Sequence, residues 1–231
     1  MTFTKNNSNV RRAGRRRKIF PSVTVEQFRR LLKHPLIATE PYRTMVLLAG
    51  CTSLRAGELA ALRWCDVNVD DDGGGTIYVR TAKVCKTPNV PLSPRLAAVL
   101  WRWRSQSRFS RPDDLMFASP FSRGKLPYHP ARVHYRLKAA GVDIGFGALG
   151  WHTLRVSYAT WLRMIGVSIT VHAALMRYAR APTTPLDAIP LDGAVLESSM
   201  REANSKLADL VMGITPGTEA HKDKAYETVK Q

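Results

Sequence analysis

Cysteine and long apolar runs are scarce in this 231-residue sequence. Its three cysteines, Cys51, Cys65 and Cys85, are odd in number and form no Cys-x-x-Cys pair. We therefore expect neither a disulfide framework nor a zinc ribbon, and a reducing cytoplasm as the compartment. No apolar stretch approaches the roughly 18 residues of a membrane span. The first 20 residues are basic and polar, so we also expect no signal peptide.

Acidic residues are also few: 18 Asp and Glu stand against 35 Lys and Arg, giving a net charge of +17 and a pI near 10.4. Seven of the basic residues and none of the acidic ones lie within residues 1–20. The remainder keeps 28 basic against 18 acidic residues, an excess of ten, so the folded part is basic as well. Such a charge favours a polyanionic partner, with nucleic acid ahead of an anionic membrane surface or an RNA assembly.

Helical periodicity dominates the rest of the sequence. Thr24-x-x-Gln27 is a capping-box pattern at the start of an apolar helical stripe. Residues 151–165 give the clearest helix, because Leu154, Tyr158, Trp161 and Ile165 recur on one side of it. Further helices are expected near Pro41, over 55–63, after Ser93-Pro94, from His129-Pro130 to Gly141, from Ser168, and over 197–210.

One stretch has a different pattern. The turn sequence of residues 70–75 precedes a short alternating strand over 76–81, and residues 90–92 form a second extended piece. Together they predict a small antiparallel sheet with Lys83 and Lys86 on its connecting hairpin. The predicted fold class is therefore mostly α with one small antiparallel β-sheet. We expect a disordered basic arm over 1–21, one domain over 22–212 and a flexible tail over 213–231.

Four side chains could together act on a phosphodiester. Arg55 lies where a loop enters a helix, Lys83 lies beside the hairpin turn, and His152 and Arg155 are one helical turn apart. Arginine binds phosphate oxygens with a fixed fork of N–H groups, and lysine or histidine can protonate a leaving oxygen. Taken singly, each has an ordinary alternative: a surface charge, or for His152 a residue held by packing beside Trp151. If they act together, they should converge within about 10 Å of one another.

Five segments, in order and at matching intervals over residues 22–210, resemble the catalytic domain of the tyrosine recombinases, or phage-type integrases. The segment around Leu54-Arg55-Ala56-Gly57-Glu58-Leu59 resembles their first-arginine motif. The other four are Lys83 with Val90-Pro91-Leu92, His152-Thr153-Leu154-Arg155, Ala174-Leu175-Met176-Arg177-Tyr178, and Thr183-Thr184.

The resemblance implies a catalytic role for each matching residue. Arg55 and Arg155 would clamp the scissile phosphate, Lys83 would protonate the 5′ oxygen, and His152 would assist proton transfer. In the family, a tyrosine attacks the phosphate to give a 3′-phosphotyrosyl intermediate, which a second DNA end resolves. The implied partner is double-stranded DNA, together with other recombinase subunits and no membrane. No metal or other cofactor is implied.

The sequence departs from the family pattern in three ways. Tyr178 occupies the position usually held by His or Trp, where its hydroxyl could still donate to a phosphate oxygen. The nucleophile's usual positions, nine or ten residues further on, hold Asp187 and Ala188, and no tyrosine lies between Tyr178 and Tyr226. We also expect the family's N-terminal DNA-clamping domain to be absent, with the Arg-rich arm of residues 1–20 in its place.

These departures predict a degenerate integrase, such as the product of a decaying mobile-element gene, that binds DNA and cannot cleave it alone. One alternative is an active recombinase that uses a tyrosine donated by another subunit, or a displaced Tyr178 or Tyr226. Another is a non-enzymatic DNA-binding accessory or regulatory protein. The expected localisation is cytoplasmic, on the nucleoid when DNA is bound.

Overall fold

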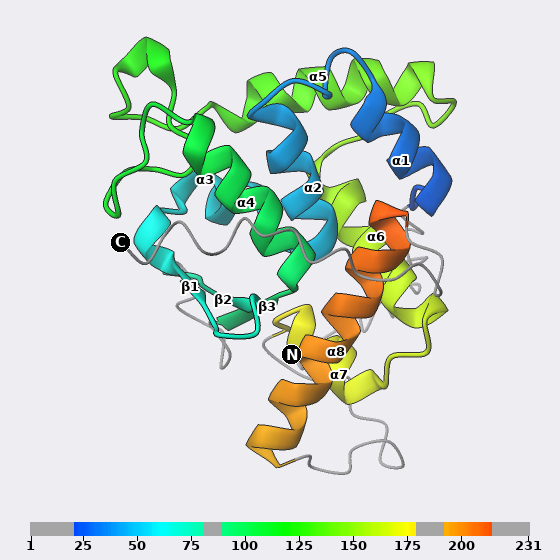
Figure 1. Ribbon diagram of the computed structural model, residues 1–231. Coiled ribbons are helices and arrows are strands. Elements are labelled where there is room, and N and C mark those ends of the chain that lie inside the picture. Colours follow the sequence, from blue (N-terminus) through cyan, green and yellow to red (C-terminus); the bar gives the residue numbers. More distant parts are fainter. Residues whose placement is uncertain (1–20, 81–88, 179–191, 214–231) are drawn as a thin grey trace, which may run out of the picture.

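The computed structural model describes residues 21–80, 89–178 and 192–213. The main helices are α1 (Val25–Lys33), α2 (Tyr42–Thr52), α3 (Ala56–Ala61), α4 (Pro94–Gln106), α5 (Pro130–Asp143), α6 (Trp151–Met164), α7 (Ile169–Leu175) and α8 (Gly193–Met212). Two short 3-10 helices, η1 (Trp64–Asp66) and η2 (Pro120–Ser122), and three strands, β1 (Val67–Val69), β2 (Gly75–Tyr78) and β3 (Asn89–Leu92), complete the fold. Figure 1 shows the helices gathered around α2, with the small sheet to one side.

Most helices begin where the sequence predicts a cap. The capping box of α1 is formed in both directions, since Gln27 N–H donates to Thr24 Oγ1 at 3.1 Å and Thr24 N–H donates to Gln27 Oε1 at 2.9 Å. Ser93 caps α4 and Ser168 caps α7, each by accepting from the backbone N–H three residues ahead. Helix α5 runs two residues past the expected Gly141, and α8 begins four residues before the expected residue 197, because Asp192 supplies its cap.

The sheet has the order β1-β2-β3, and both pairs are antiparallel. The predicted pair corresponds to β2 and β3, whereas β1, with three residues, is too short for its alternation to be recognised in the sequence. Strand β2 can pair closely with β1 because Gly75 has no side chain: a Cβ there would lie 2.2 Å from the Asn68 carbonyl oxygen. The connection that carries Lys83 and Lys86 lies outside the described residues.

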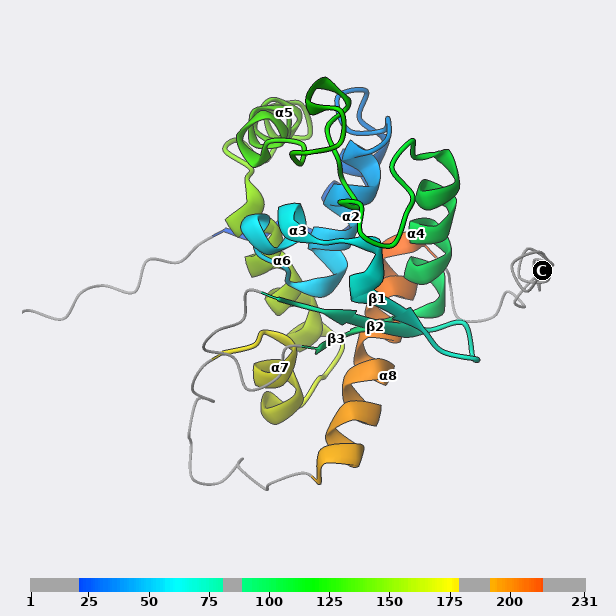
Figure 2. The same cartoon turned by 90° about the vertical axis from the view of Figure 1, so that its left-hand side faces the viewer.

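Helix α2 forms the centre of the core. All its residues from Thr44 to Thr52 are buried, and it packs against α6, α8, α4 and α1. The stripe predicted on α6 is buried at Leu154, Tyr158 and Trp161, and the Trp161 ring packs edge-on to Phe28 with centroids 5.1 Å apart. Figure 2 shows the sheet below α2, α3 and α5, with α7 and the first turns of α8 on its other side.

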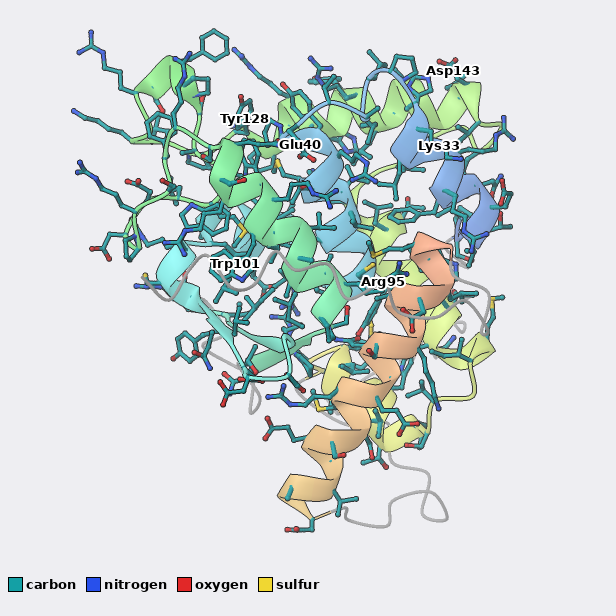
Figure 3. The ribbon with its side chains drawn as sticks, in the orientation of Figure 1. Lys33, Glu40, Arg95, Trp101, Tyr128 and Asp143 are labelled. Carbon is teal, nitrogen blue, oxygen red and sulfur yellow. The ribbon has the colours of Figure 1, made fainter. Side chains whose placement is uncertain are left out.

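Polar contacts hold α8 against the rest of the domain. The buried Asn204 of α8 accepts a hydrogen bond from Tyr158 Oη at 2.7 Å and donates to the Pro91 carbonyl of β3, also at 2.7 Å. Arg95 of α4, on the side of that helix facing α8 in Figure 3, pairs with Asp209 at 3.6 Å. These contacts join the sheet, α4 and α6 to α8. Among the described helices, none has the length and apolar character of a membrane span.

Candidate functional site

The carbonyl of Ser53, at the C-terminal end of α2, is the meeting point of the candidate site. Ser53 has a left-handed backbone with φ of +54°, which turns the chain from α2 toward α3. Its carbonyl oxygen accepts hydrogen bonds from Nη1 of Arg155 on α6 and, at 3.3 Å, from Nη2 of Arg177 after α7. Its hydroxyl donates to the Leu175 carbonyl at 2.8 Å. The end of α2 thus ties together the first turns of α6 and the end of α7.

Arg55 lies at the start of α3, as the sequence predicts, and Glu58 holds it there. One Glu58 oxygen accepts from the Arg55 backbone N–H at 2.8 Å, and the other accepts from Arg55 Nη1 at 2.8 Å. A carboxylate in the first turn also interacts favourably with the positive end of the helix. The Arg55 side chain is 56% exposed and that of Glu58 only 6%, so the guanidinium faces solvent while its partner is inside the protein.

Arg155 lies next to this pair, one turn into α6. In addition to its contact with Ser53, its Nη2 donates to the Met176 carbonyl. Burial lowers the pKa of Arg155, and the positive charges of Arg55 and Arg177 lower it further, whereas Glu58 acts in the opposite direction. An arginine stays protonated despite such shifts, so the three guanidinium groups face one carboxylate with an excess of two positive charges. We call Arg55, Glu58, Arg155 and Arg177 the arginine cluster.

His152 and Tyr178 are close in sequence to two members of the arginine cluster, Arg155 and Arg177. His152 is exposed and three residues before Arg155, so exposure argues against the alternative of a histidine held by packing. The helix start beside it is anchored by Trp151, whose Nε1 donates to the Pro130 carbonyl of α5 at 3.0 Å. Tyr178 follows Arg177, is 45% exposed and acts electrostatically on Arg155; its ring lies 6.4 Å from that of His172.

The structure therefore brings Arg55 and Arg155 into one cluster, with His152 on the adjoining turn and Tyr178 next to Arg177. Lys83 lies outside the described residues, so its convergence with the others stays a prediction. The same holds for Thr183-Thr184, Asp187, Ala188 and Tyr226. In the part of the chain that the structure describes, no group of three or more His, Cys, Asp or Glu side chains could hold a metal ion.

Glu58 and Arg177 belong to the cluster, although the sequence predicts a role for neither of them. Glu58 could have been found from its spacing, because an acidic residue three positions after a helix-starting residue is typical of an N-terminal cap. Burial by itself raises the pKa of Glu58, but hydrogen bonds from the Arg55 N–H and from the Arg177 and Arg55 guanidinium groups outweigh it and hold that pKa below its ordinary value. Arg177 lies within one of the segments that resemble the family, but nothing in the sequence assigned it a role among the 35 basic residues.

Residues 21–185 match the sequence model of the phage integrase family. This match covers more than half of the chain, so the chain belongs to that family, the tyrosine recombinases. It is similar to tyrosine recombinase XerA of Thermococcus kodakarensis, with 31% identity over 170 residues that cover 74% of this chain and 58% of the relative. The chain thus spans less than two thirds of that relative's length.

Two solved structures confirm the predicted fold class. The integrase from mycobacterium phage Brujita superposes with a TM-score of 0.57 at 20% identity, covering 87% of this chain and 67% of that one. The XerH site-specific recombinase, crystallised with its difH substrate in a pre-cleavage complex, superposes with a TM-score of 0.54 at 18% identity, covering 76% of this chain and 51% of that one.

Proposed function

We propose that this chain binds duplex DNA by its phosphodiester backbone at the arginine cluster. The observation that carries the proposal is an excess of two positive charges: two guanidinium groups bond the single carboxylate of Glu58, and that of Arg155 lies near enough to interact with it. A phosphodiester supplies negative charge there, and its two non-bridging oxygens can accept from the paired N–H groups of a guanidinium. The structural relative that is bound to a DNA substrate supports the same ligand.

Arg55 and Arg155 are proposed as the direct phosphate contacts. The Arg55 guanidinium is more than half exposed, and Glu58 holds it from its inner side. Arg155 is fixed by the Ser53 and Met176 carbonyls, which accept from two of its five N–H groups. Because both side chains are held in place by protein acceptors, little rotamer entropy remains to be lost when a phosphate binds. His152, Tyr178 and Lys83 are proposed to contact the same phosphate or its leaving oxygen.

We further propose that the chain does not cleave DNA alone. Strand cleavage in the family needs a tyrosine oxygen to form a bond to phosphorus while the 5′ oxygen leaves with a proton. Asp187 is a poor substitute, because a carboxylate repels the phosphate and its adduct would be a labile mixed anhydride. An exposed Tyr178 beside Arg155 favours one second candidate, an active recombinase that uses a displaced tyrosine. Other recombinase subunits are proposed partners, and a DNA ligand is consistent with a cytoplasmic, nucleoid-bound location.

Binding is tested by fluorescence anisotropy of the full chain on a labelled duplex of about 30 base pairs, between about 50 and 200 mM salt. We expect affinity to fall by at least about tenfold over this range, since several phosphate contacts release counterions. An affinity that does not change with salt would contradict phosphate binding at the cluster.

Cleavage is tested with a duplex nicked near the scissile phosphate, which traps a covalent protein–DNA adduct if one forms. The proposal expects no adduct from this chain alone. An adduct that disappears in Tyr178→Phe would support the displaced nucleophile, and one that disappears in Tyr226→Phe would assign the reaction to the C-terminal tail. Adduct formation only after an inactive, tyrosine-bearing recombinase is mixed in would indicate a donated tyrosine. A chain that binds duplex DNA and forms no adduct in any arm fits the degenerate integrase or the accessory protein.

A further inference from the structure

Arg177 enters the interior in an unusual way. It follows Met176, the C-cap of α7, and has a left-handed backbone with φ of +52°, a conformation that side-chain-bearing residues rarely adopt. Its backbone N–H donates to the Ala174 carbonyl at 2.9 Å, which closes the end of the helix. The residue is only 3% exposed, although arginine is seldom buried without a specific partner. A strained backbone and a buried charge at one residue suggest that its side chain has a particular task.

Arg177 forms a buried ion pair with Glu58. Nη2 of Arg177 donates to Oε2 of Glu58 at 2.6 Å, and both side chains are almost fully enclosed, at 1% and 6% exposure. The other Glu58 oxygen accepts from the exposed guanidinium of Arg55. Glu58 therefore lies between two arginines, one facing the interior and one facing the proposed phosphate site.

A carboxylate in this position has two opposing effects on an incoming phosphate. It holds Arg55 in place, which favours binding, and its own negative charge repels the phosphate at short range. A second cation on its inner side removes the repulsion and leaves the hydrogen bond to Arg55 intact. Without Arg177, the excess positive charge of the cluster falls from two to one, and the buried carboxylate depends on one solvent-exposed partner.

We propose that Arg177 is a positioning residue of the phosphate site: it neutralises Glu58 from the interior, so that Glu58 can hold Arg55 without repelling the phosphate. This inference rests on the proposed function, since it concerns the same site. In this arrangement, Arg177 acts through Glu58 and does not itself contact DNA. Two other roles are possible for a buried arginine, direct phosphate contact and fold stability alone, and each predicts a different experimental result.

The first experiment needs no DNA. The pH titration of the Glu58 side-chain carboxyl is followed by ¹³C NMR in the wild-type chain and in Arg177→Met. The charged groups that face Glu58 are Arg55, Arg155 and Arg177, with Asp66 and Arg80 lining the same small cavity. Since these other groups are unchanged in the variant, we expect the Glu58 carboxyl to titrate at a clearly higher pH in Arg177→Met. An unchanged titration would overturn the inference.

The second experiment is a double-mutant cycle in DNA binding with wild type, Arg177→Met, Glu58→Gln and the double variant. We expect Arg177→Met to weaken binding about tenfold in the wild-type background and by less than about twofold in the Glu58→Gln background, because the charge that it neutralises is then absent. The salt slope should be the same in wild type and Arg177→Met. Equal losses in both backgrounds, with a salt slope smaller by about one, would indicate direct phosphate contact and overturn the inference.

Controls separate these outcomes from misfolding and from failure of the proposed function. Arg201→Met removes another arginine that pairs with carboxylates, Asp70 and Glu197, and should leave the affinity within about twofold of wild type. If Arg177→Met does not fold, Arg177→Lys, which keeps the charge, should bind and titrate like wild type; a Lys variant that folds and binds tenfold more weakly would contradict neutralisation as the role. If the wild-type chain binds no DNA, the proposed function fails, and the carboxyl titration still decides whether Arg177 controls Glu58.

Discussion

The two ends of α2 carry two basic regions with different organisation. At the C-terminal end, the arginine cluster is held by the carbonyls of Ser53 and Met176 and by Glu58. At the N-terminal end, about 15 Å away along the helix, a cleft of about 400 Å³ is lined by side chains of α1, α2 and the end of α8. Its basic lining residues are Arg29, Arg30, Lys33 and Arg43, and Figure 3 shows Lys33 on α1.

The difference lies in how the cations are held. In the cleft, Arg29 donates to the Leu210 and Val211 carbonyls at 2.6 and 3.3 Å, so it serves as a cap for the C-terminal end of α8. Its one acidic neighbour there, Glu26, lies 3.8 Å away and is largely exposed. The arginine cluster instead draws guanidinium groups from three segments around a buried carboxylate. The two regions therefore differ in the buried carboxylate of Glu58, which gathers arginines at one end of α2 and has no counterpart among the residues that line the cleft.

Glu58→Gln should have the largest effect on stability, a loss of about 3 kcal/mol at neutral pH, because it leaves a buried arginine without its counter-charge. The pKa of Glu58 in the folded state lies below its ordinary value. The ionised carboxylate therefore stabilises the fold at pH values above the ordinary Glu pKa. This contribution is lost as the pH falls through the folded-state pKa. The measurement is urea unfolding of both proteins from pH 7 down to about pH 3. The difference in unfolding free energy between wild type and Glu58→Gln should narrow as the pH falls below 4.5, the ordinary pKa of Glu. A difference that does not change with pH would count against the ion pair.

Arg155→Met should weaken duplex DNA binding about 100-fold, because it removes a phosphate contact and leaves the Ser53 and Met176 carbonyls with fewer donors. Anisotropy at low salt measures this loss. The matched control is Arg163→Met on the same helix, whose side chain is exposed, and its affinity should change by less than about threefold. Equal losses in the two variants would mean that net charge, and not the cluster, determines binding.

Arg29→Ala should affect folding and not DNA binding. Loss of its two hydrogen bonds to the end of α8 should destabilise the protein by about 1 kcal/mol, read as a lower urea midpoint. Affinity for DNA should stay within about twofold of wild type. A large loss of affinity with unchanged stability would show that the cleft binds DNA as well, and the contrast between the two ends of α2 would then fail.

Arg43→Ala should have the smallest effect, below about 0.5 kcal/mol in stability and below about twofold in DNA affinity. Arg43 lines the open cleft and has no ion pair among the residues that the structure describes. Thermal unfolding and anisotropy at two salt concentrations measure both quantities. If Arg43→Ala lowered DNA affinity as strongly as Arg155→Met, the basic cleft would have to contribute to DNA binding as much as the arginine cluster does.

Sequence patterns predicted most helix starts correctly, and the residues show why. Thr24, Ser93 and Ser168 accept hydrogen bonds from N–H groups three residues ahead, an interaction that depends on local sequence alone. Strand β1 was missed because three residues carry too little periodicity, and its pairing with β2 depends on a glycine contact. In the site, Arg55 and Arg155 were found from motif spacing, whereas Glu58 and Arg177 were not identified before the fold was known.

The basic character of the chain, the helix caps, and the order of motifs that marks the phage integrase family can all be read from the amino-acid sequence. These properties follow from composition and from interactions within a few residues. Only the tertiary structure decided which few of the many arginines surround one carboxylate, since Ser53 and Arg155 are 102 residues apart and Glu58 and Arg177 are 119 apart. Burial raises the strength of such distant charge contacts and is a property of the packed fold, so the local sequence does not show that Arg177 is buried and Arg163 exposed.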